Sequence, residues 1–210
     1  MRVGTVWGKA NSLRWALQMG AAVALSLAAS GMAQASPVVI KGQLPKGHCT
    51  KAIYGTKGDD VLDGSDSRCD ETILGLNGND ILIGGRGKNV LIAGRGQDTL
   101  TGGTRNFGTL FVFRARSSAP ESPDMITDFV DSGPFADRIS LIGVCADQGC
   151  TFLGTAPFSG SAGEIRYEVL DKNGETVTEL MADRDGDGSA DLAIDLAGVQ
   201  TLTTDNVLFK

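Results

Sequence analysis

The sequence predicts an all-β protein, in which a parallel β-roll of glycine-rich nonapeptide repeats is followed by a β-rich C-terminal cap or sandwich. A nine-residue period built on Gly, Asp and an aliphatic residue runs from residue 55 to residue 103, and such a period is typical of stacked parallel coils. Segments after residue 110 alternate apolar and polar residues, as half-buried strands do. No long 3.6-residue apolar pattern follows residue 35, so we expect the rest to be mostly β.

Residues 1–35 are predicted to be a secretory signal peptide. The segment starts with basic residues and has no acidic one, then continues with the apolar run AAVALSLAA and the A-x-A sequence at Ala33 to Ala35. The alternative is a membrane anchor, but the apolar run is about half the ~20 residues that a spanning helix needs. We therefore expect a secreted, extracellular or periplasmic protein with no membrane insertion after signal removal.

The charge of the remaining chain excludes several partner classes. Removal of residues 1–35 leaves 16 Lys and Arg against 25 Asp and Glu, a net charge of −9. An acidic chain without a basic stripe is a poor partner for nucleic acid or anionic lipid. The same charge favours the binding of cations.

Four cysteines in an exported chain predict two disulfides. Closeness in sequence favours the pairs Cys49–Cys69 and Cys145–Cys150, although three connectivities remain open. A zinc site is a weaker alternative, because neither pair has C-x2-C spacing and the single histidine, His48, has no evident partner.

The chain is predicted to divide into the signal peptide 1–35, a lead-in segment 36–50, the β-roll 51–113 and a C-terminal β region 114–210. Within the last region, Asn173-Gly174 predicts a hairpin turn between two strands. Strands are expected at Glu164 to Val169 with Ile165, Tyr167 and Val169 on one face, at Thr176 to Met181, at Leu192 to Leu196 with alternate residues on one face, and at Val207 to Phe209.

In each nonapeptide the first six residues suit a turn and the last three suit a very short strand. The aliphatic residue at position eight should point inward and stack on its equivalents, which are Leu62, Leu82, Leu91 and Leu100. The resulting interior is thin, so it offers little apolar area against the entropy of ordering many glycines. Stacked aspartates would also repel one another, and a hard divalent cation such as Ca²⁺ removes that repulsion by binding carboxylate and carbonyl oxygens.

Alternate repeats should face the same edge of the roll. On one edge this register predicts two calcium sites, Asp60/Asp80 and Asp80/Asp98, with carbonyl oxygens from Gly58, Gly78 and Gly96. On the other edge one repeat has eleven residues and leaves Glu71 nearest the ligand position, Asn89 replaces an aspartate as a weaker ligand, and Arg105 replaces a glycine. We therefore expect weak calcium sites or none on that edge.

The repeats, such as GLNGNDILI, resemble the nonapeptides of RTX proteins, which form a β-roll holding Ca²⁺ between successive turns. The later segments GGTRNFGTLFVF, PDMITDFVDSGPFADRISLIGV, FSGSAGEIRY and DGDGSADLAIDLAG are similar to the region after the repeats in serralysin-type metalloproteases. In that family this region is non-catalytic, so the resemblance implies a calcium-binding module. There is no H-E-x-x-H motif and one histidine cannot form a histidine zinc triad, so protease activity is not expected.

A separate acidic loop lies near the C-terminus. Asp183, Asp185 and Asp187 with Gly188 resemble the first half of an EF-hand loop, and Asp191 is a candidate further ligand. The twelfth position is Ile194 rather than Glu, so a polar β-turn is the alternative. Three other aspartates, Asp124, Asp128 and Asp137, are candidate additional ligands near the end of the roll, but solvated loops are the expected alternative for them.

The sequence thus predicts a non-enzymatic, exported calcium-binding protein whose roll folds on binding Ca²⁺ and which serves as a structural or adhesive module. The alternative is a binder or regulator of another secreted protein, such as a protease. An enzyme with an unrecognised site is a third class, but no catalytic constellation stands apart from the proposed calcium ligands. An extracellular protein or matrix partner is expected, and the sequence does not identify it.

Overall fold

The computed structural model describes residues 38–43, 49–103, 107–115, 117–145 and 149–209. The predicted signal peptide lies outside the described residues. The described part of the chain contains only strands, turns and bends, and it belongs to one compact unit. The all-β prediction is confirmed.

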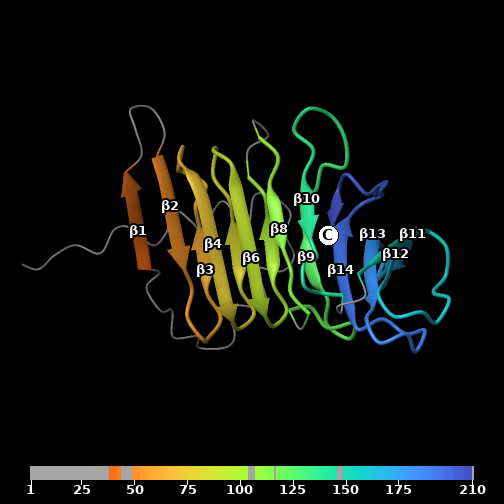
Figure 1. Cartoon of the computed structure of the whole chain (residues 1–210). Coiled ribbons are helices and arrows are strands. Elements are labelled where there is room, and N and C mark those ends of the chain that lie inside the picture. The colour runs from red at the N-terminus through yellow and green to blue at the C-terminus, as the bar shows by residue number, and fades with distance from the viewer. Residues whose placement is uncertain (1–37, 44–48, 104–106, 116, 146–148, 210) are drawn as a thin grey trace, which may run out of the picture. The chain divides into compact units, whose positions relative to one another are not determined.

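The strands form two sheets (Figure 1). Sheet A contains, in spatial order, β1 (Val38–Gln43), β2 (Cys49–Tyr54), β4 (Asp70–Asn77), β6 (Asn89–Arg95), β8 (Leu110–Val112), β10 (Arg138–Ser140) and β15 (Val207–Leu208). Sheet B contains β11 (Thr151–Gly154), β12 (Glu164–Lys172), β13 (Glu175–Asp183), β14 (Leu192–Ala197), β9 (Asp124–Ile126), β7 (Thr99–Thr101), β5 (Ile81–Ile83) and β3 (Val61–Asp63).

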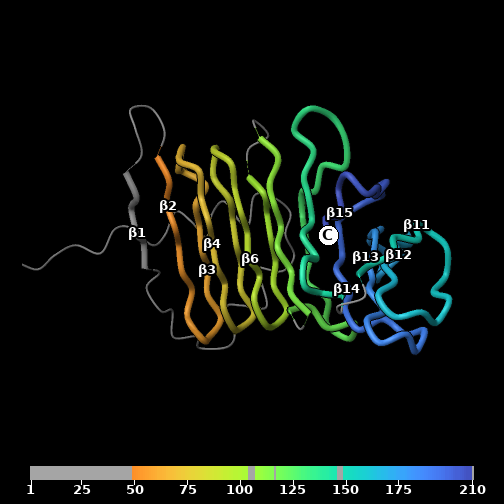
Figure 2. Tube along the Cα trace, in the orientation of Figure 1, coloured from red at the N-terminus to blue at the C-terminus, as the bar shows by residue number. Residues whose placement is uncertain are grey.

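From β2 to β10 the chain alternates between the two sheets, so consecutive coils stack with parallel pairing (Figure 2). Within sheet A, Ile73 lies opposite both Ile53 and Leu91. Within sheet B, Leu82 lies opposite Leu62 and Leu100. This arrangement is the predicted parallel β-roll. At its N-terminal side β1 pairs antiparallel with β2, inside the segment that the sequence predicts as a lead-in.

The space between the sheets is filled by one file of aliphatic and aromatic side chains per sheet. All four leucines predicted to point inward have no exposed surface. They are joined by Ile53, Ile73, Phe111, Ile126 and Ile139, which are also buried. Each buried side chain of this size contributes roughly 1.5–3 kcal/mol. One or two per coil give a narrow core, and the turns must supply the remaining stability.

Both sheets continue beyond the repeats. Strand β9 pairs in parallel with β7 on one side and with β14 on the other, and β14, β13 and β12 then continue sheet B in antiparallel pairing. The predicted hairpin joins β12 to β13, with φ of 58° at Asn173 and 87° at Gly174, as a tight two-residue turn requires. The C-terminal region therefore extends the sheets of the roll.

Two strands of this region differ in detail from the sequence prediction. Val169 was expected on the buried face with Ile165, but it is 46% exposed because it lies towards the hairpin tip. In β14 the residues from Leu192 to Leu196 are all buried, not only alternate ones. The polar Asp195 is covered by Lys172, whose Nζ lies 2.8 Å from its Oδ1 and 2.6 Å from Glu179 Oε1.

Two disulfides are present, Cys49–Cys69 and Cys145–Cys150, as their closeness in sequence favours. The first joins the start of β2 to the turn that precedes β4, and so it links two neighbouring coils. The second closes a short loop before β11. No free cysteine is found in the described part of the chain.

The two disulfides should contribute unequally to stability. The first closes a loop of 20 residues and the second a loop of 5, so chain entropy gives roughly 3 and 2 kcal/mol respectively. Paired Cys→Ser substitutions should therefore lower the free energy of unfolding more for Cys49/Cys69 than for Cys145/Cys150. Chemical denaturation in the presence of calcium measures this difference. Equal losses, or a larger loss for the second pair, would contradict it.

Candidate metal centre

The first edge of the roll is the side on which the chain passes from sheet A to sheet B. Each turn on this edge ends in an aspartate directly before a short strand: Asp60 before β3, Asp80 before β5 and Asp98 before β7. Glycines allow these turns to stack closely. Gly78 and Gly96 have φ of 112° and 130°, which side chains rarely adopt.

The three aspartates form a ladder that joins successive coils. The backbone N–H of Asp60 donates to Asp80 Oδ1 at 2.8 Å, and the N–H of Asp80 donates to Asp98 Oδ1 at 2.8 Å. All three residues are at most 5% exposed. The pairs Asp60/Asp80 and Asp80/Asp98 that the sequence predicts are thus brought together.

The second carboxylate oxygens of this ladder are poorly satisfied. Asp60 Oδ2 accepts from the N–H and hydroxyl of Thr56, but the Oδ2 atoms of Asp80 and Asp98 are buried and have no hydrogen-bond partner among the described residues. A buried anionic oxygen without a donor is costly. Each therefore needs a cation or a proton.

The glycines at the start of these turns let the carbonyl of the next coil approach closely beside the carboxylates. A side chain at Gly75 would collide with the carbonyl oxygen of Ala93 and lie 2.5 Å from Asp80 Oδ2. A side chain at Gly55 would collide with the carbonyl oxygen of Gly75 and lie 3.0 Å from Asp60 Oδ2. Carboxylate and carbonyl oxygens thus converge at both places, and this donor set fits a hard cation such as Ca²⁺.

The carbonyl groups in these two places belong to the first residue of a repeat. The repeat pattern predicts carbonyl ligands at Gly58, Gly78 and Gly96, which stack directly on one another at the tips of the turns. It does not predict the Gly75 and Ala93 carbonyls. The recurrence of a small residue at the first position of each repeat is the signal that points to them.

Asp124 continues the ladder as a fourth member. The N–H of Asp98 donates to Asp124 Oδ1 at 2.7 Å, and Asp124 Oδ2 is another buried oxygen without a partner. Ser118 fixes this end, because its Oγ accepts from the N–H of Asp124 and donates to the carbonyl of Ala193 in β14. The expectation of a solvated loop is wrong for Asp124, which has no exposed surface.

Burial raises the pKa of three ladder carboxyls. It raises the pKa of Asp80 to about 7, and the negative charges of Asp98, Asp60 and Asp59 add to this, against the opposing hydrogen bond from Asp60 N–H. Burial likewise raises the pKa of Asp98 to about 6 and that of Asp124 to about 8. A proton is therefore the competitor of any cation on this edge.

The second edge, where the chain returns from sheet B to sheet A, is organised differently. Asn89 Nδ2 donates to the carbonyls of Gly85 and Gly102 at 3.0 and 2.8 Å, and Thr109 Oγ1 donates to the same Gly102 carbonyl at 3.0 Å. Side-chain donors here bridge carbonyls of successive coils. The first edge has only acceptors at the equivalent positions.

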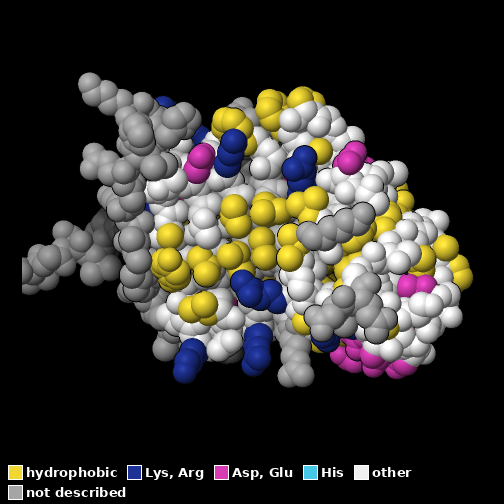
Figure 3. Space-filling model, in the orientation of Figure 1, with side chains coloured by type: hydrophobic (Ala, Val, Ile, Leu, Met, Phe, Trp, Pro, Cys, Tyr) yellow, Lys and Arg dark blue, Asp and Glu magenta, His cyan; other side chains and the backbone are white. Residues whose placement is uncertain are grey.

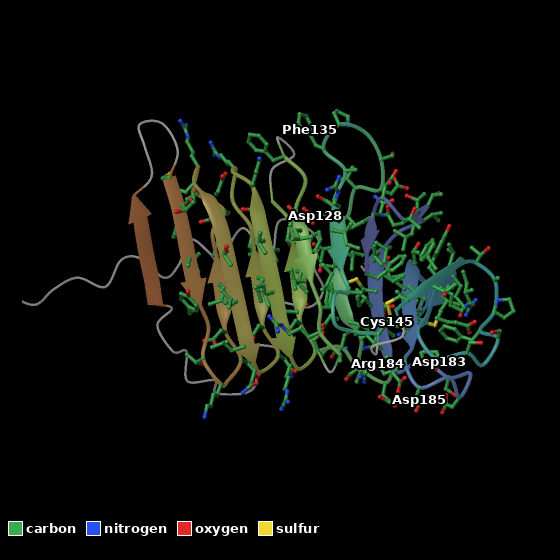
Figure 4. All side chains as sticks on the ribbon, in the orientation of Figure 1. Asp128, Phe135, Cys145, Asp183, Arg184 and Asp185 are labelled. Atoms are coloured by element: carbon green, nitrogen blue, oxygen red, sulfur yellow. A yellow bond between two sulfur atoms is a disulfide. The ribbon has the colours of Figure 1, made fainter. Side chains whose placement is uncertain are left out.

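Two further aspartates on the second edge bind backbone N–H groups. Asp137 accepts from Thr109 and Val130 at 2.6 and 2.9 Å, and it is 5% exposed, so the solvated-loop expectation is wrong for it too. Asp128 (labelled in Figure 4) accepts from Gly102 and Gly103 at 2.7 and 3.2 Å. Both carboxylates hold the turns of this edge together.

The C-terminal acidic loop follows β13. Asp183, Asp185 and Asp187 each place a carboxylate oxygen within 4.8 Å of the others, and Asp183 and Asp185 are labelled in Figure 4. Asp183 is buried and accepts from the N–H groups of Gly186 and Gly188 at 2.7 and 2.8 Å. Asp191 closes the loop by accepting from the N–H of Arg184 at 2.7 Å. The four predicted residues thus belong to one hydrogen-bonded loop.

Residues 56–208 match the family described as peptidase M10 serralysin C terminal. The chain belongs to this family. Two solved structures are similar to this chain, and both are subunits of mannuronan C5-epimerase from Azotobacter vinelandii. The AlgE6R3 subunit has 29% identity, a TM-score of 0.53, and covers 74% of this chain and 80% of its own. The AlgE6R2 subunit has 27% identity, a TM-score of 0.51, and covers 74% and 91%. Among curated proteins no match was found.

Membership of this family indicates the general character of the chain. The family is the non-catalytic C-terminal domain of secreted proteases, and its fold is a calcium-binding β-roll module of the RTX type. Within the described residues there is no helix of the length and apolarity needed to span a membrane.

The protein should become less stable as the pH rises when calcium is chelated. Folded Asp80, Asp98 and Asp124 keep protons that the unfolded chain, with a pKa of 3.8, loses, so unfolding releases protons between about pH 4 and pH 8. The urea midpoint in chelator should therefore be lower at pH 8 than at pH 5.

The variant Asp80→Asn is the control for this pH dependence, because it removes one of the three groups and should flatten the decline. A midpoint that is equal or higher at pH 8 in the parent chain would contradict the assignment.

Proposed function

We propose that this protein is an exported, non-enzymatic calcium-binding module with a structural or adhesive role, whose β-roll folds when Ca²⁺ binds along the first edge. The observation that carries this proposal is the ladder of four stacked aspartates with three buried, unpartnered oxygens. Such a ladder is unfavourable without positive charge, because desolvated like charges repel across every step.

The ligands would come from neighbouring coils. Asp60, Asp80 and Asp98 would supply carboxylates, and the small residues at the starts and tips of the turns would supply carbonyls. The proposed set on this edge comprises Gly58, Asp60, Gly78, Asp80, Gly96 and Asp98, and we extend it to Asp124 and the carbonyls of Gly75 and Ala93 because these oxygens lie beside the ladder. Bound Ca²⁺ would supply the positive charge that these oxygens lack and would link one coil to the next.

Two weaker positions complete the proposed ligand set. Asn89 offers a side-chain oxygen on the second edge, but this oxygen also accepts from the N–H of Gly85 at 3.2 Å and its nitrogen bridges two carbonyls. The loop of Asp183, Asp185, Asp187 and Asp191 brings three carboxylates within 4.8 Å, and its two exposed members, Asp185 and Asp187, point oxygens to the same place as buried Asp183. We assign this loop a separate calcium site.

Export to an oxidising compartment is supported by the two disulfides, since such bonds persist outside the reducing cytosol. A module of this kind meets low calcium during synthesis and roughly millimolar calcium after export. Sites with affinities of ~10⁻⁴–10⁻³ M fill only in the second environment. Binding free energy then becomes folding free energy.

The proposal predicts that the β structure of residues 51–103 depends on calcium and on Asp80. Adding CaCl2 to the chelated chain without residues 1–35 should increase the far-UV circular dichroism signal of β structure. Asp80→Asn, which belongs to two adjacent sites, should lower the bound Ca²⁺ measured by calorimetry by about two ions and raise the midpoint calcium concentration of folding about tenfold or more.

The matched control is Asp66→Asn, because Asp66 is an exposed aspartate in a second-edge turn and carries the same charge. It should bind calcium like the parent chain. β structure unchanged by chelation, or an Asp80→Asn variant with full calcium binding, would show that the ladder is not a calcium site.

The alternative function, binding or regulation of another secreted protein, is favoured by the outer face of sheet A. Four partly exposed apolar residues lie side by side in register across β2, β4, β6 and β8, namely Tyr54, Leu74, Ile92 and Val112. Figure 3 shows hydrophobic side chains gathered over these strands. A contiguous exposed apolar row of this kind is typical of an interaction surface.

Leu74→Glu tests this alternative, because it places a charge in the middle of the row without touching the core. If the protein regulates a secreted partner, the chain in calcium should capture one protein at equal stoichiometry from the exported fraction. The Leu74→Glu variant should capture at least tenfold less of that protein. Thr101→Glu, on the outer face of sheet B, is the control. If no stoichiometric partner is captured, or if both variants capture it equally, the regulatory function is contradicted and the structural role remains the proposal.

A further inference from the structure

The outer face of sheet A carries a second row of side chains beside the row of Tyr54, Leu74, Ile92 and Val112. Buried and partly exposed residues alternate along β4 and β6, so every second residue faces outward. Two residues earlier on each strand, the neighbouring row comprises Ala52, Thr72, Val90 and Leu110, which are all partly exposed. The two rows form one almost entirely apolar band across β2, β4, β6 and β8, which we call the apolar band.

Positively charged side chains flank the apolar band. On the second-edge side, Lys88 precedes β6, and Arg138 begins β10 opposite Leu110 at the end of the band. On the first-edge side, Arg95 ends β6 and Arg114 follows β8. These four cations are exposed, and none forms a salt bridge among the described residues. Figure 3 shows Lys and Arg side chains above and below the hydrophobic surface of these strands.

Negative charge on this face is sparse. Among the described outward residues of β2, β4, β6, β8 and β10, Asp70 is the single acidic one. Its Oδ1 accepts from the backbone N–H of Lys88 at 2.9 Å. The face is therefore basic although the chain as a whole is acidic. The sequence shows no basic stripe, because the four cations come from separate parts of the chain that the sheet brings together.

The dimensions of the apolar band match those of one α-helix. Neighbouring strands lie about 4.8 Å apart, so four strands span about 14 Å, the length of about ten helical residues. Successive outward residues of one strand lie about 7 Å apart, and an α-helix with its side chains is about 10 Å wide. A helix that crossed the strands would cover both rows and bring its two flanks beside the basic residues.

Two other occupants fit this face less well. A second copy of the chain, packed face to face, would bring its own basic flanks against these, and like charges repel. A flat anionic bilayer would meet the exposed Lys and Arg side chains before the apolar residues between them, which are only partly exposed. Charge and width together favour a helix that is acidic on both sides of an apolar stripe.

We propose that the apolar band binds an amphipathic α-helix of a partner protein, with an apolar stripe against the sheet and Asp or Glu on both flanks. Leu74 and Ile92 contact the stripe at the centre of the band, as in other sites that receive an amphipathic helix. The basic residues on the two sides pair with the acidic flanks and so fix the orientation of the helix. The proposal rests on the alternative function above and specifies the chemistry of its partner.

Two labelled synthetic peptides of about 18 residues test the proposal, since shorter isolated helices are marginal in water. Both carry leucine at the i, i+3, i+4 and i+7 positions of one face. The Glu peptide has glutamate on both flanks, and the Lys peptide has lysine at the same positions. Fluorescence anisotropy with the protein in millimolar calcium measures their binding. The Glu peptide should bind at least about tenfold more tightly than the Lys peptide, and its affinity should fall at high salt because exposed charges are screened.

Charge reversal provides a gain of binding that a damaged fold could not give. The double variant Arg95→Glu/Arg114→Glu should bind the Glu peptide about tenfold more weakly than the parent and should bind the Lys peptide more tightly. Arg166→Gln is the control, because it removes a positive charge from β12 in sheet B. It should bind the Glu peptide like the parent chain. Leu74→Glu should also weaken binding of the Glu peptide by about tenfold, because it places a like charge in the centre of the band.

The outcomes separate the proposal from the function on which it rests. Equal binding of the two peptides overturns it. Binding to vesicles of phosphatidylcholine and phosphatidylglycerol without binding of the Glu peptide overturns it in favour of a lipid surface. Dimers in sedimentation that Leu74→Glu dissociates overturn it in favour of a second copy. If neither peptide binds while Leu74→Glu still loses a captured protein, the acidic helix is wrong and the alternative function stands. If neither peptide binds and no protein is captured, both are wrong.

Discussion

The coils of the roll can stack only by bringing buried carboxylate and carbonyl oxygens close together, and the rest of the structure depends on this constraint. Each coil contributes little apolar area, because one leucine, isoleucine or phenylalanine per strand fills the interior. The turns must therefore bind to each other, and on the first edge they do so through a backbone N–H that donates to the aspartate of the next coil. The same contact that joins two coils places a second, unsatisfied oxygen in the interior. The contact that joins two coils is therefore also the reason why the second carboxylate oxygen needs a cation or a proton.

The two edges of the roll resolve this conflict in different ways. On the second edge Asn89 and Thr109 provide donors from within the chain, and Asp137 accepts two backbone N–H groups. On the first edge the carboxylates of Asp80 and Asp98 have no such donor on Oδ2. One edge is thus satisfied over much of its length by donors within the chain, while the other has buried carboxylate oxygens without a hydrogen-bond donor among the described residues.

Much of the fold could be predicted from the sequence, because the repeat period itself determines which residues point inward. Leu62, Leu82 and Leu100 follow from position eight, and the hairpin follows from Asn173-Gly174. The fourth ladder member could not be predicted in this way. Asp124 lies 26 residues after Asp98, since the chain between them leaves the nine-residue period, and only the pairing of β9 with β7 brings it into register. A local period carries no information about where an irregular segment returns.

The pattern also could not show what surrounds Glu71 in the irregular repeat. Glu71 was assigned to a weakened edge because the repeat length is wrong, whereas the close approach of Gly64, Gly85 and Glu71 is visible only in three dimensions. The burial of β14 on both faces has a similar cause. Lys172 reaches Asp195 from two strands away. Alternation along one strand cannot reveal that a side chain from another strand covers one of its residues.

The ladder has a direction. Every rung donates towards the C-terminus, from Asp60 to Asp80, Asp98 and Asp124, and only the last rung is fastened elsewhere, through Ser118 to β14. Synthesis proceeds from the other end, so the repeats are made before the strand that anchors them. Until β14 has been made, the row of carboxylates lacks a fixed terminus. The anchored end of the ladder is therefore made last, and a chain truncated before β14 would keep the repeats without the contact between Ser118 and Ala193.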